Sequence, residues 1–150
     1  MHKICFTIIA ALLLTTSTHA ASGLISVKSA HDVKTTADRL ENMLAQKGMK
    51  VFIRIDHAQG ARQIGQELRP TELIIFGNPK VGTPLMQCAQ SVGIDLPQKA
   101  LIWRDAQGQV WLSYNDPNYL AERHQIAGCA DVIEQVGKAL GNFAKSATTP

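Results

Sequence analysis

The chain has 150 residues, of which 45% are hydrophobic and 18% are charged. This balance is typical of a globular protein and excludes disordered, collagen-like and repeat-array chains, and the length indicates one domain. The net charge is +3, and the basic residues are scattered. A charge this small gives no indication of nucleic acid or an anionic membrane surface as a partner.

The first 20 residues have the three-part layout of a secretory signal peptide. A basic start at Met1–Lys3 precedes an apolar run at Ile4–Leu14, and small residues lead to Ala20. This run of 11 residues, broken only by Thr7, would rise about 16 Å as a helix, against roughly 30 Å of membrane hydrocarbon, which disfavours a retained anchor. We expect cleavage after about Ala20, a periplasmic or secreted protein, and no membrane association afterwards.

The mature chain is expected to be a single domain over residues 21–150, with its core at 23–144 and a frayed tail at 145–150. Cys5 leaves with the signal, so Cys88 and Cys129 remain. In an oxidising compartment this pair permits one disulfide. The alternative is two buried thiols that pack as small apolar groups. The sequence leaves both open.

The first half of the mature chain predicts a strand at 23–27, a helix from Val33 and a strand at 51–56. Ser29 and Asp32 resemble a capping box for the helix, whose apolar positions recur every three or four residues until Gly48. Residues 58–70 are polar and contain two glycines. They predict a loop, with at most a helical turn near 61–67.

The second half predicts a buried strand at 71–77 and a helix capped by Thr83, which precedes a proline. Strands at 100–104 and 109–114 flank a hairpin loop at 105–108, and a short helix follows Asp116. A final helix is spaced by Ile133, Val136, Leu140 and Phe143. Trp103 and Trp111 lie on the two hairpin strands, and we expect them on opposite faces.

This order predicts an α+β two-layer sandwich. A hairpin between neighbouring strands favours a mostly antiparallel sheet, and amphipathic helices would pack on one face of it. A doubly wound parallel sheet is disfavoured.

Several motifs together resemble one bacterial family. They are Arg54–His57, Leu68–Pro79, Gly82–Gln87, Gly93–Pro97 and Trp111–Pro117. Over about 23–144 the chain resembles the family named domain of unknown function 302. The resemblance implies a small α+β domain related in shape to one repeat of the TATA-box-binding protein and often paired as a homodimer. It implies no established reaction, and the two cysteines are not part of the family pattern.

Two histidines lie at element ends, where functional side chains often gather. His57 follows Asp56 at a strand end, and His124 ends the short helix. If these ends meet, Asp56, His57 and His124 would be candidate catalytic residues in a proton relay. The alternative is one helix-capping and one hydrogen-bonded loop histidine. No metal-binding motif is present, and we predict no metal site and no cofactor.

Further polar residues near the same element ends predict a ligand site. A guanidinium can bind a carboxylate or phosphate, and a helix N-terminus can hold an anion. The candidate ligand-binding residues are Arg54, His57, Arg69, Asn78, Lys80, Tyr114, Asn115 and His124. Ordinary ion pairs and a capped loop are the alternative for this group.

The sequence therefore favours a domain that binds a small or anionic ligand in a polar cleft near His57 and His124. One alternative is a homodimerising interaction module of the cell envelope, and another is an acid–base enzyme that uses Asp56 and His57. The sequence does not decide whether any reaction is catalysed. No nucleic-acid partner is expected.

Overall fold

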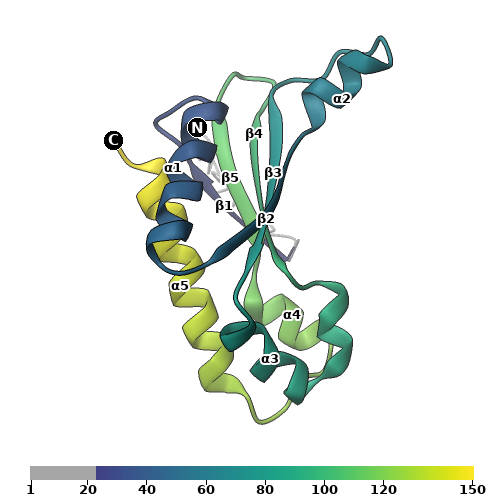
Figure 1. The fold of residues 1–150 in the computed structure, drawn as a ribbon, viewed down its shortest axis with the longest axis vertical. Helices are drawn as coiled ribbons and strands as arrows, with labels where there is room; N and C mark the ends of the chain where they lie inside the picture. The colour runs from purple at the N-terminus through teal and green to yellow at the C-terminus, as the bar shows by residue number, and fades with distance from the viewer. Residues whose placement is uncertain (1–22) are drawn as a thin grey trace, which may run out of the picture.

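The computed structural model describes residues 23–150. Within them lies a five-stranded sheet with the order β1-β5-β4-β3-β2, in which every neighbouring pair is antiparallel (Figure 1). The strands are β1 (Leu24–Lys28), β2 (Lys50–Asp56), β3 (Thr71–Gly77), β4 (Gln98–Arg104) and β5 (Val110–Asn115). The helices are α1 (Val33–Gln46), α2 (His57–Gln63), α3 (Pro79–Cys88), the 3₁₀ helix η1 (Gln90–Ile94), α4 (Pro117–Arg123) and α5 (Ala130–Thr148).

Helices α1 and α5 cover one face of the sheet, which confirms the predicted two-layer α+β architecture (Figure 1). The covered face carries alternate strand residues such as Ile74, Phe76 and Ile102, each at most 1% exposed. Leu40 and Leu44 of α1 are buried against them. Because strand side chains alternate between faces, the other half of each strand forms the second, uncovered face, called here the open face.

Local capping residues set where the helices begin. Asp32 caps α1 by accepting a hydrogen bond from the Thr35 amide at 2.7 Å, whereas the Ser29 hydroxyl bonds to Thr36 instead of completing a capping box. Helix α3 begins at Pro79 and is capped by Asn78, so the start predicted at Thr83 is wrong.

The predicted frayed tail is also wrong. Helix α5 continues to Thr148, and Ala144, Ala147 and Thr148 are buried. These small side chains allow the last turns of α5 to pack closely against the rest of the helical layer, so Ala147 and Thr148 belong to the core.

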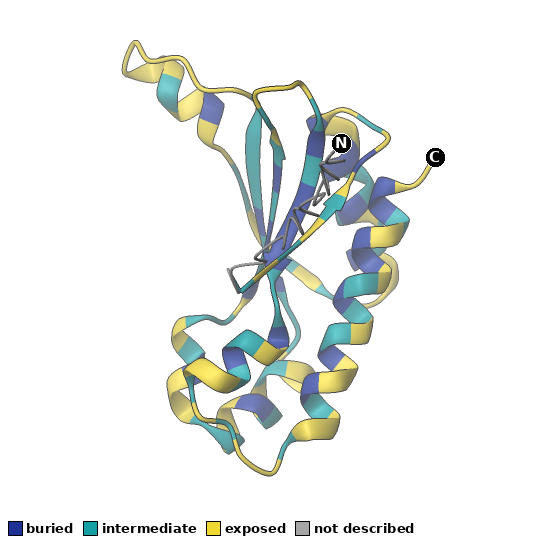
Figure 2. Cartoon of the chain, turned by 180° about the vertical axis from the view of Figure 1, so that it is seen from behind, coloured by how far each residue is buried: buried dark blue, intermediate teal, exposed yellow. Residues whose placement is uncertain are grey.

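Residues 57–70 are defined here as the arm, and residues 58–70 of it were expected to form a loop. Instead they begin with α2, because the Asp56 carboxylate accepts a hydrogen bond from the Gln59 amide and caps this helix. The arm projects from the sheet on the side away from α1 and α5 (Figure 1). Most of its residues are exposed, including Ile64 at 75% (Figure 2).

The predicted hairpin at 105–108 joins β4 and β5. Trp103 lies directly opposite Trp111 in this pairing, so the two rings share the open face. The expectation that they occupy opposite faces is therefore wrong, because two cross-strand partners in an antiparallel pair always point to the same side.

Strand β2 contains a β-bulge between Val51 and Ile53. The extra residue, Phe52, changes the alternation, so that Val51 and Arg54 face the helices while Ile53 and Ile55 lie on the open face. A regular strand would have kept all three aliphatic residues on one face, as the sequence pattern suggested.

Cys88 and Cys129 form a disulfide, which decides between the two alternatives left open above. The bond links the last residue of α3 to the residue before α5, with a Cα–Cα distance of 6.5 Å. It therefore holds the α3 end of the domain against the start of the longest helix.

The predicted signal peptide and Cys5 lie outside the described residues. Across residues 23–150, no helix has the length and apolar character needed to cross a membrane.

Candidate functional site

The structure does not bring the predicted site residues together. Asp56 pairs with Glu72 at one end of the β2–β3 ladder, while Lys50 pairs with Gly77 at the other. These ends are about 20 Å apart, because each strand residue advances the chain by about 3.3 Å. His57 follows Asp56 at the first end and Asn78 follows Gly77 at the second. The expected common cleft is therefore not formed.

At the first end, His57 is the first residue of α2 and is exposed. Within residues 23–150 its ring makes no hydrogen bond. Asp56 caps the helix and lies 3.7 Å from Arg62, so its carboxylate is engaged away from the His57 ring. The arrangement does not form the acid–base pair expected from the sequence.

The two arginines at this end, Arg54 and Arg69, make structural hydrogen bonds. Arg54 donates hydrogen bonds to Asp38 at 2.6 Å, to Glu41 at 2.8 Å and to Glu72, which ties α1 to the sheet. Burial lowers the pKa of Arg54, but these carboxylates outweigh burial and raise it above its ordinary value. Arg69 donates to the carbonyl oxygen of Arg104 at 3.1 Å.

At the opposite end, Asn78 acts as a helix cap and a loop tie. Its side-chain oxygen accepts from the Lys80 amide, and its nitrogen donates to the Gly48 carbonyl. The Lys80 side chain is exposed. Neither side chain forms the anion cradle expected from the sequence.

Tyr114 and Asn115 end β5. Tyr114 is only 5% exposed beneath the helical layer. Burial, and to a smaller extent the charge of Asp116, raises the pKa of Tyr114 above its ordinary value of 10.0. Asn115 is half-buried and pairs with Leu24 on the open face. Tyr114 is therefore part of the core.

His124 is the predicted residue with the most developed surroundings. Its Nε2 lies 2.6 Å from an Asp95 carboxylate oxygen and its Nδ1 lies 3.1 Å from the Ser91 hydroxyl. Ser91 and Asp95 were missed from the sequence. They lie 33 and 29 residues before His124 and form no motif with it, so only the fold reveals this cluster.

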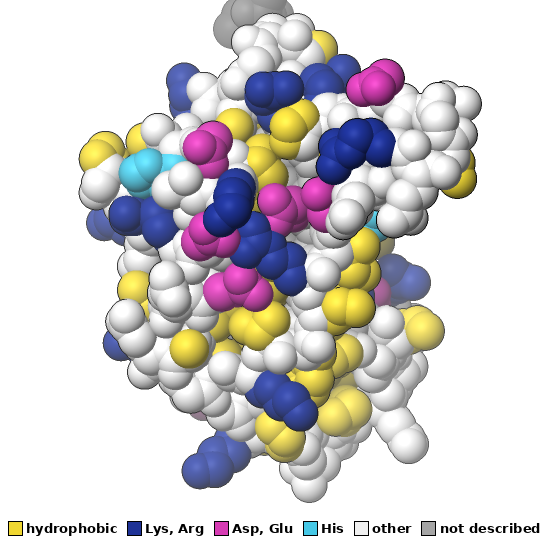
Figure 3. All heavy atoms as spheres, turned by 45° about the horizontal axis from the view of Figure 1, so that its top comes forward, with side chains coloured by type: hydrophobic (Ala, Val, Ile, Leu, Met, Phe, Trp, Pro, Cys, Tyr) yellow, Lys and Arg dark blue, Asp and Glu magenta, His cyan; other side chains and the backbone are white. Residues whose placement is uncertain are grey.

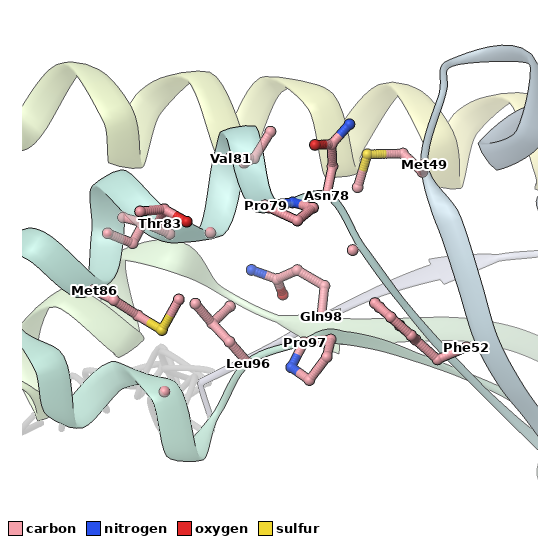
Figure 4. A pocket seen from close by; sticks show the side chains of 14 residues that line it. Met49, Phe52, Asn78, Pro79, Val81, Thr83, Met86, Leu96, Pro97 and Gln98 are labelled. Carbon is pink, nitrogen blue, oxygen red and sulfur yellow. The ribbon is translucent and has the colours of Figure 1, made fainter.

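A cavity of about 310 Å³ lies beside α3. This apolar pocket is lined by three parts of the chain (Figure 4). They are the start of β2 with the end of β3, helix α3, and the segment that leads into β4. Its apolar side chains include Met49, Phe52, Val81, Met86, Leu96 and Pro97. Three of them are well exposed, with Phe52 at 48%, Val81 at 39% and Met86 at 36%.

Three polar side chains line this pocket, namely Asn78, Thr83 and Gln98, and the Gln98 amide points into it. Gln98 is 8% exposed, and its amide lies among Pro79, Leu96 and Pro97 (Figure 4). No hydrogen bond joins this amide to any other residue of the 23–150 segment. The sequence pattern indicates that Gln98 is buried. In a strand, every second side chain points to the same face, and Gln98 therefore shares a face with the buried Ala100 and Ile102.

Residues 23–150 contain no cluster of three metal-binding side chains. Acidic and basic side chains are interspersed on the face shown in Figure 3. No charged side chain lines the pocket within the described residues, so its polar groups are the Thr83 hydroxyl, the Gln98 amide and the Asn78 amide, which is already bonded to Gly48 and Lys80.

Residues 25–143 match the family described as Domain of unknown function DUF302. The chain belongs to the DUF302 family. A solved structure of an uncharacterised conserved DUF302 protein from Bacillus stearothermophilus has the same fold, with a TM-score of 0.76. It is 19% identical, and the match covers 85% of this chain and 99% of that one.

Some longer proteins contain a segment similar to this DUF302 chain. Proteins named Fluoride-specific ion channel FluC 1, from Brucella suis biovar 1 and Brucella abortus biovar 1, are each 50% identical to it over 111 residues. The match covers 74% of this chain but 44% and 41% of those proteins. The chain thus spans less than half the length of these relatives.

Proposed function

We propose that this exported DUF302 protein binds a small, mainly apolar ligand in the apolar pocket beside α3. The carrying observation is Gln98, a residue only 8% exposed whose amide makes no hydrogen bond within residues 23–150 and points into a cavity of about 310 Å³. A volume of this size is at the lower end of the range for small-molecule sites.

The chemistry of the lining defines the ligand class. A primary amide offers two donors and one acceptor, and the Gln98 amide has these free for a ligand because it makes no hydrogen bond within residues 23–150. A ligand that carries both an acceptor and a donor, such as a carboxamide, would pair with it. The two flexible thioethers, Met49 and Met86, can adapt to the rest of the ligand.

Binding of simple aromatic amides, beginning with benzamide, tests the proposal by calorimetry. We expect Gln98→Leu to weaken binding at least tenfold, or about 1.4 kcal/mol, because the ligand loses its hydrogen-bonding partner, while the fold is kept. Gln63→Leu, which removes an amide from the exposed arm, is the matched control.

A second variant fills the pocket. A Cβ added at Gly82 meets only the Leu96 side chain within 4 Å, at an ordinary 3.7 Å. We expect Gly82→Leu to occupy the cavity and abolish binding while the fold is kept. Equal binding by wild type, Gln98→Leu and Gly82→Leu, or no binding across a series of apolar amides, would contradict the proposal.

The second candidate function is an interaction module that forms a homodimer. Exposed apolar side chains on the open face and on the arm favour it, for example Ile53 at 50% and Ile64 at 75% exposure. In the longer relatives named as fluoride channels, a similar segment is joined to further sequence, as is typical of a module. The two candidates use different surfaces and are compatible.

A further inference from the structure

Ser91, His124 and Asp95 form a continuous hydrogen-bonded chain at the end of the domain that carries α3 and α4. Ser91 lies in η1, Asp95 directly follows it, and His124 ends α4. The Ser91 hydroxyl is 3.1 Å from Nδ1 of the ring, and the Asp95 carboxylate is 2.6 Å from Nε2. The ring therefore connects a hydroxyl to a carboxylate.

The chemistry of the partners fixes the direction of these bonds. An ionised carboxylate only accepts, so Nε2 of His124 must carry the proton that binds Asp95. In the neutral ring Nδ1 is then unprotonated and is an acceptor. The Ser91 hydroxyl must donate to it, which is the arrangement that a general base needs to take up a serine proton.

A nucleophilic serine must be accessible to its substrate, while its base is best held in a sheltered position. The side chains of His124 and Asp95 are 7% and 14% exposed, while Ser91 is an exposed residue. Arg123 lies 3.5 Å from the second oxygen of Asp95, and the Lys99 ammonium donates to its backbone carbonyl. The base and its partner are sheltered and held, whereas the hydroxyl is accessible.

The other histidines of the described chain lack such surroundings. His31 pairs with the backbone carbonyl of Thr149, and the His57 ring is exposed without a hydrogen bond inside residues 23–150. A purely structural tie between η1 and α4 would be complete with the Asp95–His124 bond. The additional, outward-facing hydroxyl is the feature that indicates reactivity.

We propose that Ser91 is a nucleophile activated by His124 and that it attacks small carboxylic esters. Ser91 Oγ forms a bond to the ester carbonyl carbon while its proton passes to Nδ1 of His124. The bond from that carbon to the alcohol oxygen then breaks, and the alcohol leaves with this proton. Water attacks the acyl-serine in the same way and releases the carboxylic acid. Asp95 is a positioning residue that fixes the tautomer of the ring.

An alkyl fluorophosphonate, which modifies activated serines, tests the proposal on the oxidised, purified protein. Intact-mass measurement is expected to show one adduct, mapped to Ser91, that is lost in Ser91→Ala. His124→Gln should slow labelling about 100-fold or more. Ser26→Ala is the control, because the Ser26 hydroxyl pairs with that of Ser113 and with no histidine. It should label like wild type.

The pH profile separates a positioning role from a structural one. Wild-type labelling and hydrolysis of p-nitrophenyl acetate should be lost in acid, because a protonated ring cannot accept the serine proton. Asp95, Arg123 and Lys99 are the charged groups around the ring. Asp95→Asn should keep its circular dichroism but label slowly at every pH. No adduct on wild type, or an adduct that persists in Ser91→Ala, would overturn the proposal.

Discussion

Asp105 holds the β4–β5 hairpin together through one carboxylate. Its oxygens accept hydrogen bonds from Nε1 of Trp111 at 2.8 Å and from the backbone amides of Gln107 and Gln109. The bond from Trp111, followed by those from the two amides, holds the pKa of Asp105 below its ordinary value of 3.8, although a little burial opposes the shift. The ionised form is thus favoured by the fold.

This lowered pKa predicts how the hairpin responds to acid. Since the folded-state pKa lies below the unfolded one, the carboxylate stabilises the fold above pH 3.8, and this contribution is lost as the pH falls through the folded-state value. Asp105→Asn should therefore lower the melting temperature at pH 7, and the difference from wild type should narrow at the acid end of the titration.

Thermal unfolding monitored by tryptophan fluorescence at several pH values measures this difference. Glu122→Gln, which neutralises an exposed carboxylate of α4, is the control and should leave the melting temperature nearly unchanged. A gap between wild type and Asp105→Asn that stays constant down to the lowest pH would contradict the assignment.

At the residue scale, sequence patterns predicted local roles better than shared sites. The loop at 105–108 and the helix cap at Asp116 follow from turn and capping preferences that act within a few residues. The convergence of His57 with His124 required knowing how strands align. His57 follows the end of β2, whereas His124 is bonded to Asp95 just before β4, at the opposite end of the sheet. No local preference encodes this pairing of strands.

At the scale of elements, the disulfide is the strongest constraint at the α3 end. It closes a loop with a sequence separation of 41 and joins α3 to the start of α5. A crosslink over a loop of this length is expected to stabilise the fold by about 4 kcal/mol, because it restricts the unfolded chain. The double variant Cys88→Ala/Cys129→Ala should lose about this much free energy of unfolding.

Urea unfolding checks the magnitude, and hydrogen exchange checks the place. Amides of α3 and of the first turn of α5 should exchange faster in the double variant, whereas α1, packed on the far part of the sheet, should keep its protection. Reduced wild-type protein should behave like the double variant. Unchanged stability on reduction would show that the crosslink is not a major constraint.

Element type was predictable where periodicity and caps agree, as in α1 and β3. The prediction failed where two signals compete. Asn78 precedes Pro79 and Thr83 precedes Pro84, so both pairs resemble a helix start, and the earlier one is used. The bulge at Phe52 was not predictable, because an extra strand residue has no distinctive composition in this sequence.

At the scale of the whole molecule, the helices of residues 23–150 leave one face of the sheet open. The open face carries cross-strand rows of apolar residues on β2, β3 and β4, including Ile53 opposite Ile75 and Ile55 opposite Leu73. The side toward β1 is polar, with Ser26 opposite Ser113. The arm projects on the same side as the open face and carries the exposed Ile64 (Figure 1).

We expect a second copy of the chain to cover this surface. Two such faces related by a twofold axis would place apolar rows against each other, and each arm would extend toward its partner.

Light scattering at increasing concentration should therefore report a dimer. Ile53→Lys should shift it to monomer, because a charge would be buried against the partner. Gln135→Lys, an exposed position on α5 in the helical layer, adds the same charge elsewhere and should leave the dimer intact. A strict monomer at every concentration, or equal effects of the two lysines, would refute the open face as the interface.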